Sequence, residues 1–138
     1  MSTKKKGSLG QKAIVCIADS DVEVCNSIKF LLATDNIQAT GFCNGQSVLD
    51  FALRTPPNCI ITEAFLSDTT GVVLLKRLYE QNLHVPVIIL ANTSEISAAV
   101  NAVKAGAWDY YEKPVVQRVL LDSVQRAIRH NRRQVLKQ

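Results

Sequence analysis

Acidic side chains and a lysine stand directly after apolar segments of this chain, where they could take part in chemistry. "IVCIA" leads into the acid–serine–acid run 19–21, "CIIT" leads into Glu63, and Lys113 follows the short segment "DYYE". Carboxylates beside an amine can form an ion pair, and carboxylates can also hold a divalent metal ion. Which chemistry applies depends on whether the fold brings these residues together.

The elements that must position these residues follow from the hydrophobic pattern. Short apolar runs alternate with amphipathic segments of ten or more residues, which indicates βαβ units and a parallel sheet. We predict strands at 13–18, 38–43, 59–63, 86–91 and 109–112. Ligands of an open parallel sheet bind beyond the carboxyl ends of its strands. Three acids and one lysine should therefore converge there: Asp19, Asp21, Glu63 and Lys113.

Five helices are expected between and after the strands. Ser20 or Asp21 can cap the first helix, Thr70 the third and Ser94 the fourth, since each side chain can accept a backbone N–H bond. The pair 56–57 (Pro-Pro) ends the second helix. No internal repeat is present.

The last helix, from about residue 116, carries a narrow stripe with alternating spacings of three and four. Its members are Leu121, Val124, Ile128, Asn131 and Val135. The spacing is that of a coiled-coil seam with one polar position. Two interpretations remain open: a helix that caps the sheet and ends in solvent, or a helix that dimerises or relays a signal to a further domain.

Composition and charge are those of one globular domain with basic ends. The 138 residues are 47% apolar and 20% charged, enough for a sizeable core. Three tail lysines and five basic side chains from Arg126 to Lys137 contribute eight positive charges, and removing them from the net +4 leaves −4 for the body. We divide the chain into a disordered basic tail (1–12), a domain (13–129) and a basic helical extension or linker (130–138).

The remaining residue classes argue against other kinds of site. Four cysteines without CxxC spacing, Cys16, Cys25, Cys43 and Cys59, favour buried free thiols over a zinc site or a disulfide framework. His84 and His130 have no ligand spacing and receive no role. No apolar run is long enough to cross a bilayer and the start lacks an apolar signal segment, so we expect a cytoplasmic protein without membrane contact.

Several motifs together resemble the receiver domain of bacterial two-component response regulators, from about residue 13 to 129. They are "IADSD", "CIITEAFLSDTTGVVLLKRL", "VPVIILA" and, most specifically, "AVKAGAWDYYEKPV". The resemblance implies a flavodoxin-like (βα)5 fold, with a five-stranded parallel sheet of order 2-1-3-4-5 and helices on both faces.

The resemblance also implies roles for the charged residues. In ordinary receivers an aspartate that ends the third strand attacks a phosphoryl group held by Mg²⁺, an acidic pair after the first strand holds the metal, and a lysine contacts the phosphoryl group. Glu63 stands at the acceptor position, Lys113 matches the lysine and Asp19 matches one acid. Ser20 replaces the second acid, which weakens any Mg²⁺ site, and Asp21 beside it is better placed to cap the helix.

Three further positions match the family's switch elements. The hydroxyl that ends the fourth strand is replaced by Ala91, Tyr110 matches the switch aromatic, and Pro114 is a candidate for a cis peptide bond. Glu63 is one methylene longer than aspartate, which moves the attacking oxygen out of line. It could imitate a phosphoaspartate with a smaller charge, leaving the domain partly active or unable to switch, or it could form only a structural ion pair with Lys113.

We therefore expect a non-enzymatic, atypical receiver in a phosphorelay that acts through protein contacts. Its partners would be a sensor kinase, an output domain or a second copy bound through the fourth helix, fifth strand and fifth helix. DNA would be reached only through an output domain outside these residues. The alternative is a receiver that uses Mg²⁺ and is phosphorylated on another acid. Flavin or nucleotide binding ranks last, because "ADSD" offers acids where a phosphate needs amides.

Overall fold

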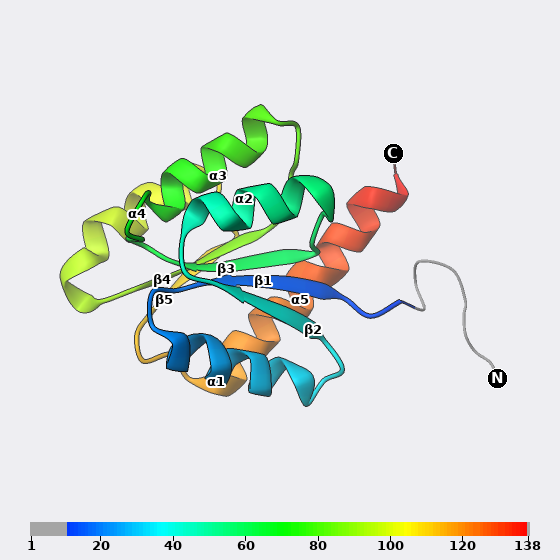
Figure 1. Cartoon of the computed structure of the whole chain (residues 1–138), viewed down its shortest axis with the longest axis horizontal. Coiled ribbons are helices and arrows are strands. Elements are labelled where there is room, and N and C mark those ends of the chain that lie inside the picture. The colour runs from blue at the N-terminus through cyan, green and yellow to red at the C-terminus, as the bar shows by residue number, and fades with distance from the viewer. Residues whose placement is uncertain (1–10, 138) are drawn as a thin grey trace.

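A single parallel sheet forms the centre of the molecule (Figure 1). The computed structural model describes residues 11–137, so nearly all of the predicted tail lies outside the described residues. The strands are β1 (Ile14–Ala18), β2 (Gln38–Phe42), β3 (Cys59–Glu63), β4 (Val87–Ala91) and β5 (Asp109–Glu112). They are arranged in the order β2-β1-β3-β4-β5, which confirms the predicted topology. Each predicted strand lies within one residue of its predicted bounds.

The central strands are the most apolar ones. The registers place Ile17 beside Gly41 of β2 and Ile61 of β3, and Ile61 beside Ile88 of β4. All five residues of β4 are buried, as expected for a strand covered on both faces. The edge strand β2 alternates between exposed and half-buried residues. The sheet therefore fixes the ends of β1, β3 and β4 next to one another.

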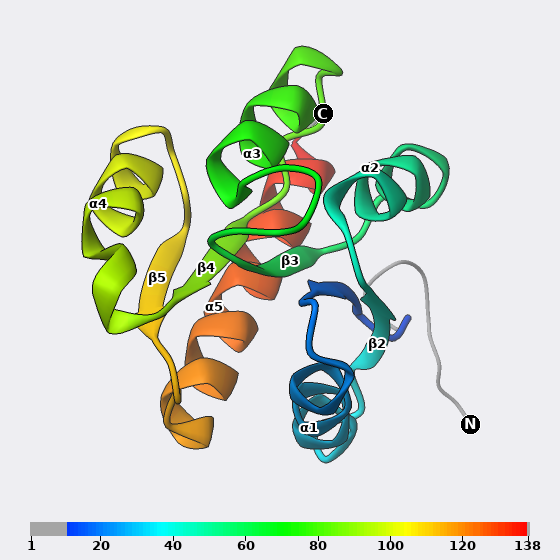
Figure 2. The same cartoon turned by 60° about the vertical axis from the view of Figure 1, so that its left-hand side comes forward.

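Helices cover both faces of the sheet (Figures 1 and 2). They are α1 (Val22–Ala33), α2 (Gly45–Arg54), α3 (Gly71–Glu80), α4 (Ile96–Lys104) and α5 (Gln117–Leu136). One buried cluster joins the sheet to α2, α3 and α4, and another joins it to α1 and α5. This is the predicted flavodoxin-like architecture.

The predicted helix caps are right at two positions and wrong at one. The side chains of Asp21 and Thr70 accept backbone N–H bonds at the starts of α1 and α3. Ser94 does not cap α4, because the chain passes through a 3-10 turn, Thr93–Glu95, before the helix begins. The carboxylate of Glu95 instead accepts the backbone N–H of Asn92 at 2.7 Å.

The stripe on α5 packs largely against its own domain. Val124, Ile128 and Asn131 are buried, whereas Val135 is exposed. The Asn58 amide nitrogen donates to Asn131 Oδ1 at 2.9 Å, and Asn58 Oδ1 accepts the N–H of Ile14 at 2.9 Å. The polar member of the stripe therefore ties α5 to the sheet, and the helix runs unbroken across the boundary that we drew at 129/130.

The cysteines are free thiols, of which three are buried as predicted. Cys43 is exposed because it follows the edge strand β2, so the prediction of a buried thiol is wrong there. Burial raises the pKa of Cys16 to about 12 and also raises the pKa of Cys59. Within residues 11–137, no helix has the length and apolar character that a membrane span needs.

Candidate functional site

Two acids and one lysine meet at the carboxyl edge of the sheet. Asp19 follows β1, Glu63 ends β3 and Lys113 follows β5. The Lys113 amine lies 2.7 Å from Asp19 Oδ2 and 3.3 Å from Glu63 Oε2. The Asp19 side chain is 2% exposed and that of Glu63 14%. The predicted convergence is therefore present for these three residues.

Each carboxylate oxygen at this edge accepts a hydrogen bond from the chain itself. Besides the two contacts with Lys113, the backbone N–H of Asp21 donates to Asp19 Oδ1 at 2.8 Å. The backbone N–H of Ser20 donates to Glu63 Oε1 at 2.7 Å. Glu63 is thus held at both oxygens, across the gap between β3 and the loop after β1. We name Asp19, Glu63 and Lys113 the carboxyl-edge triad.

The other two residues of the acidic run lie outside the triad. The carboxylate of Asp21 accepts the backbone N–H of Glu23 at 2.9 Å and so caps α1. Ser20 contributes its backbone N–H, and its side chain is exposed. The prediction that three acids converge is therefore wrong for Asp21, because the cap directs its carboxylate toward the helix start.

The charge of Lys113 is stabilised within the triad. Burial by itself would lower the pKa of the amine, but the hydrogen bond and negative charge of Asp19, followed by those of Glu63, outweigh burial. The pKa of Lys113 therefore stands above its ordinary value. The ammonium remains charged at neutral pH and occupies the space between the two acids.

The donor set does not fit the Mg²⁺ site that the family implies. Mg²⁺ needs oxygen ligands in near-octahedral geometry, whereas all four carboxylate oxygens here already accept N–H bonds. The Lys113 ammonium places a positive charge against both acids. No group of three or more His, Cys, Asp or Glu side chains suitable for a metal occurs among the described residues.

The loop after β4 is held by contacts within the protein. Ala91, at the hydroxyl position, is buried. The Thr93 hydroxyl donates to Glu112 Oε2 at the end of β5. Tyr110 is half-buried and packs against the cluster that includes α4, and the Lys113–Pro114 peptide bond is cis, as expected. Sequence reasoning missed the Thr93–Glu112 bond, since only the sheet register brings the ends of β4 and β5 together.

The loop after β3 has the shape-setting role expected for Asp68 and Gly71. The carboxylate of Asp68 accepts the N–H groups of Gly45 and Gln46 at 2.9 and 3.0 Å, which lowers its pKa. A Cβ on Gly71 would lie 2.6 Å from Ile89 Cδ1. The loop is thus fixed to α2 and to the sheet without contact with a ligand.

The sequence as a whole identifies the family to which this geometry belongs. The family model of the response regulator receiver domain matches residues 15–125. The chain is a response regulator receiver domain. Such domains are in general signalling modules without enzymatic activity of their own.

Two curated relatives show the context in which similar receivers occur. The transcriptional regulatory protein FixJ of Rhizobium meliloti is 29% identical over 84% of this receiver, and the match covers 57% of that protein. The DNA-binding transcriptional regulator NtrC of Escherichia coli K12 is 32% identical over 90% of this receiver and 26% of that protein. The chain thus spans about half or less of the length of these relatives.

Solved structures agree with the fold. Full-length FixJ from B. japonicum aligns with a TM-score of 0.80 and 30% identity, over 87% of this receiver and 59% of that chain. The receiver domain of a Luxo repressor protein from Vibrio parahaemolyticus aligns with a TM-score of 0.85 over 93% of this receiver and 98% of that chain. Its 22% identity supports the fold alone.

Proposed function

We propose that this receiver signals without phosphorylation at the usual position and acts through protein contacts. The observation that carries the proposal is the saturation of the carboxyl-edge triad: each oxygen of Asp19 and Glu63 accepts an N–H bond from the chain. A carboxylate held at both oxygens is a poor nucleophile, because attack on a phosphoryl group requires one free, aligned oxygen.

The Glu63 side chain takes over the connections that would otherwise need a bound group. It joins β3 to Lys113 and to the N–H of Ser20, and these are charge-assisted hydrogen bonds. The Thr93–Glu112 bond holds the loop after β4 where Ala91 offers no hydroxyl. Both edges of this loop are therefore fixed by permanent groups, which favours one constant arrangement over a switch.

Protein contact is supported by apolar side chains on the surface of α4 and α5. Val100 and Val103 of α4 are 45% and 49% exposed, and Val119 of α5 is 43% exposed. Figure 2 shows α4 beside β5. We propose this α4–β5–α5 surface as the contact site for a second copy or an output domain. Regulation of transcription would then follow through an output domain outside these residues, as the relatives suggest.

The test is the intact mass of the full chain after incubation with acetyl phosphate or phosphoramidate and Mg²⁺, with Glu63→Asp measured in parallel. We expect no phosphoryl adduct on the natural protein. The side chain of the Glu63→Asp variant is one methylene shorter and cannot reach the Ser20 N–H as Glu63 does. An adduct on this variant alone would therefore show that the rest of the site still supports transfer.

An adduct on the natural protein would overturn the proposal. It would support the alternative, a receiver that uses Mg²⁺ and is phosphorylated on another acid. Peptide mapping would then decide among Asp19, Asp21 and Glu63. Asp21→Asn serves as the control, because it removes a carboxylate that caps α1 and lies outside the triad.

A further inference from the structure

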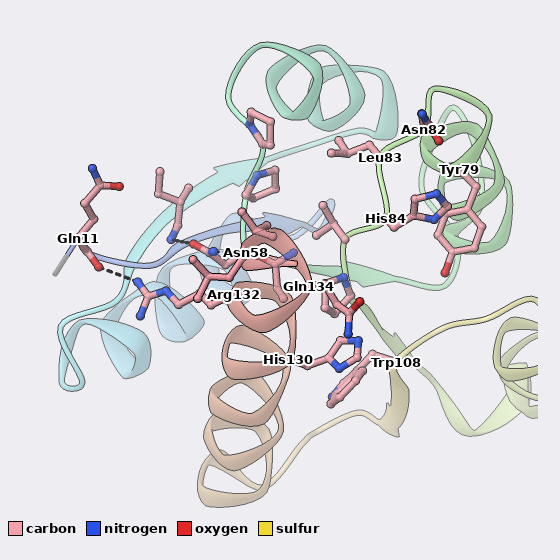
Figure 3. Close-up of a pocket in the computed structure, with 18 of the residues that line it drawn as sticks. Gln11, Asn58, Tyr79, Asn82, Leu83, His84, Trp108, His130, Arg132 and Gln134 are labelled. Atoms are coloured by element: carbon pink, nitrogen blue, oxygen red, sulfur yellow. Dashed lines mark hydrogen bonds between the residues drawn. The ribbon is translucent and has the colours of Figure 1, made fainter. Parts of the chain in front are cut away.

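A large cavity lies at the amino edge of the sheet, opposite the carboxyl-edge triad (Figure 3). Its volume is about 820 Å³, within the range of sites for small organic ligands. It is lined by residues at or before the starts of β1, β3, β4 and β5, and by the last turns of α5. We name it the amino-edge cavity.

The cavity exists because α5 continues beyond the sheet. Asn58 holds Asn131 of α5 and the N–H of Ile14, which fixes the helix against the sheet. From that anchor the helix continues to Leu136, and its final turns form one wall. Arg132 donates to the backbone oxygen of Gln11 at 2.6 Å, so the chain entering β1 is tied to the same wall.

Two aromatic–imidazole pairs line the cavity from different elements. The rings of Tyr79 and His84 lie 4.9 Å apart, between the end of α3 and the loop before β4. The rings of Trp108 and His130 lie 5.1 Å apart, between the start of β5 and α5. Figure 3 shows both pairs as separate parts of the lining. They supply flat apolar surface together with imidazole N–H donors.

The charge of the lining is positive. Lys12 and Arg132 line the cavity, and none of the described residues that line it is an aspartate or a glutamate. The body of the chain outside its basic ends carries net negative charge, so this edge differs from the rest. An arginine presents a planar set of donors that matches a carboxylate or a phosphate. The lining therefore attracts anions.

We propose that the amino-edge cavity binds a small aromatic anion. The ring would pack against Trp108 or Tyr79, and its phosphate or carboxylate would accept hydrogen bonds from Arg132, with Lys12 nearby. The donors are side chains, so this edge does not require the glycine-rich loop that a phosphate site at the carboxyl edge would need. The proposal does not depend on how Glu63 behaves, since the two sites lie at opposite ends of the strands.

Fluorescence of Trp108 tests the proposal, because this is the chain's one tryptophan. The full chain is titrated with adenosine monophosphate, benzoate, adenosine and inorganic phosphate. We expect a saturable change with at least one of the two aromatic anions, and about ten-fold weaker binding of adenosine and of phosphate. Binding of the nucleotide alone indicates a phosphate ligand, and binding of benzoate alone a carboxylate ligand. Failure of both to saturate, or equal binding of adenosine, overturns the proposal.

Matched variants locate the binding site. Arg132→Gln should weaken binding of the aromatic anion about ten-fold. Arg126→Gln is the control: it removes the same charge from the same helix, but Arg126 pairs with Asp122 and does not line the cavity. Equal weakening by both variants would mean general attraction by net charge and would overturn the site.

A second variant separates binding from folding, since Arg132 also bonds Gln11. His130→Gln removes the imidazole beside Trp108 and leaves the Arg132 contact in place. We expect weaker binding with an unchanged urea midpoint. Unchanged binding in both His130→Gln and Arg132→Gln would overturn the proposal. Glu63→Asp should bind the anion as the natural protein does, so this result stays distinguishable from failure of the proposed function.

Discussion

The two edges of the same sheet differ in how their polar groups are satisfied. At the carboxyl edge, Asp19, Glu63 and Lys113 bond one another and the backbone, so the triad is complete without a ligand. At the amino edge, charged and aromatic side chains surround an open cavity of about 820 Å³. A parallel sheet usually carries its site at the carboxyl edge. In this receiver that site is filled by the protein's own groups.

The difference shows that position in a fold does not by itself determine whether a site can accept a ligand. A binding site needs donors and acceptors that are not already paired within the protein. The longer side chain of Glu63 reaches the Ser20 N–H and Lys113 together and removes such groups from the carboxyl edge. The overhang of α5 creates them at the amino edge. Substitutions at the two edges should therefore differ in their effects.

Removal of Lys113 should give the largest effect on stability. Lys113→Met leaves the buried carboxylate of Asp19 and that of Glu63 without their cation. Breaking a buried pair from one side is costly, and after allowance for partial exposure we expect a loss of about 2–4 kcal/mol in unfolding free energy. Urea denaturation measures it. The control Arg126→Met breaks an exposed pair and should cost less than about 1 kcal/mol.

The pH dependence of this difference provides an independent check. The pKa of Lys113 is raised in the folded state, so its stabilising contribution is complete below the ordinary value of 10.5 and is lost as the pH rises through the folded value. The difference between the natural protein and Lys113→Met should therefore shrink in strongly alkaline solution. A difference that stays constant with pH would show that lost packing, and not lost charge, destabilises the variant.

At the amino edge, the anchor of α5 should matter less. Asn131→Ala leaves the Asn58 amide without its partner, and we expect a loss of about 1–3 kcal/mol in urea denaturation. The exposed Asn26→Ala on α1 is the matched control. A cost for Asn131→Ala no larger than the control's would mean that α5 is held by its apolar side chains alone. The contrast between a bonded carboxyl edge and a merely anchored amino edge would then increase.

The fold could be predicted closely because the deciding signals are local. Central strands such as 87–91 are continuous apolar runs, and Asp21 and Thr70 stand directly before helices that they cap. The resemblance to receivers then supplied the strand order. Ser94 was misassigned because a 3-10 turn and a helix start have similar sequence signals, and only the bond from Asn92 to Glu95 distinguishes them here.

Parts of both sites depend on contacts that no local pattern contains. The stripe on α5 was compatible with a coiled-coil seam, since the partner of Asn131 is Asn58, 73 residues away. The triad was expected, but the bond from the Ser20 N–H to Glu63 depends on where the loop after β1 lies. His84 and His130 received no role because their shared cavity appears only when the helix extends past the sheet.

The smallest expected effect concerns the loop after β4, which completes the carboxyl edge. Thr93→Val removes the hydroxyl that donates to Glu112. Because both side chains are exposed, we expect less than about 1 kcal/mol in unfolding free energy. Hydrogen exchange in residues 92–95 should nevertheless be faster, since the bonds between Asn92 and Glu95 lose their support from β5.

Thr34→Val is the matched control for this variant. It removes an exposed hydroxyl that donates to Leu31 at the end of α1, so exchange in residues 92–95 should remain as in the natural protein. Unchanged exchange in Thr93→Val would contradict the view that permanent bonds fix this loop. It would leave the carboxyl edge closed at the triad but mobile beside it, and the switch surface of α4 and β5 would then be free to respond to a partner.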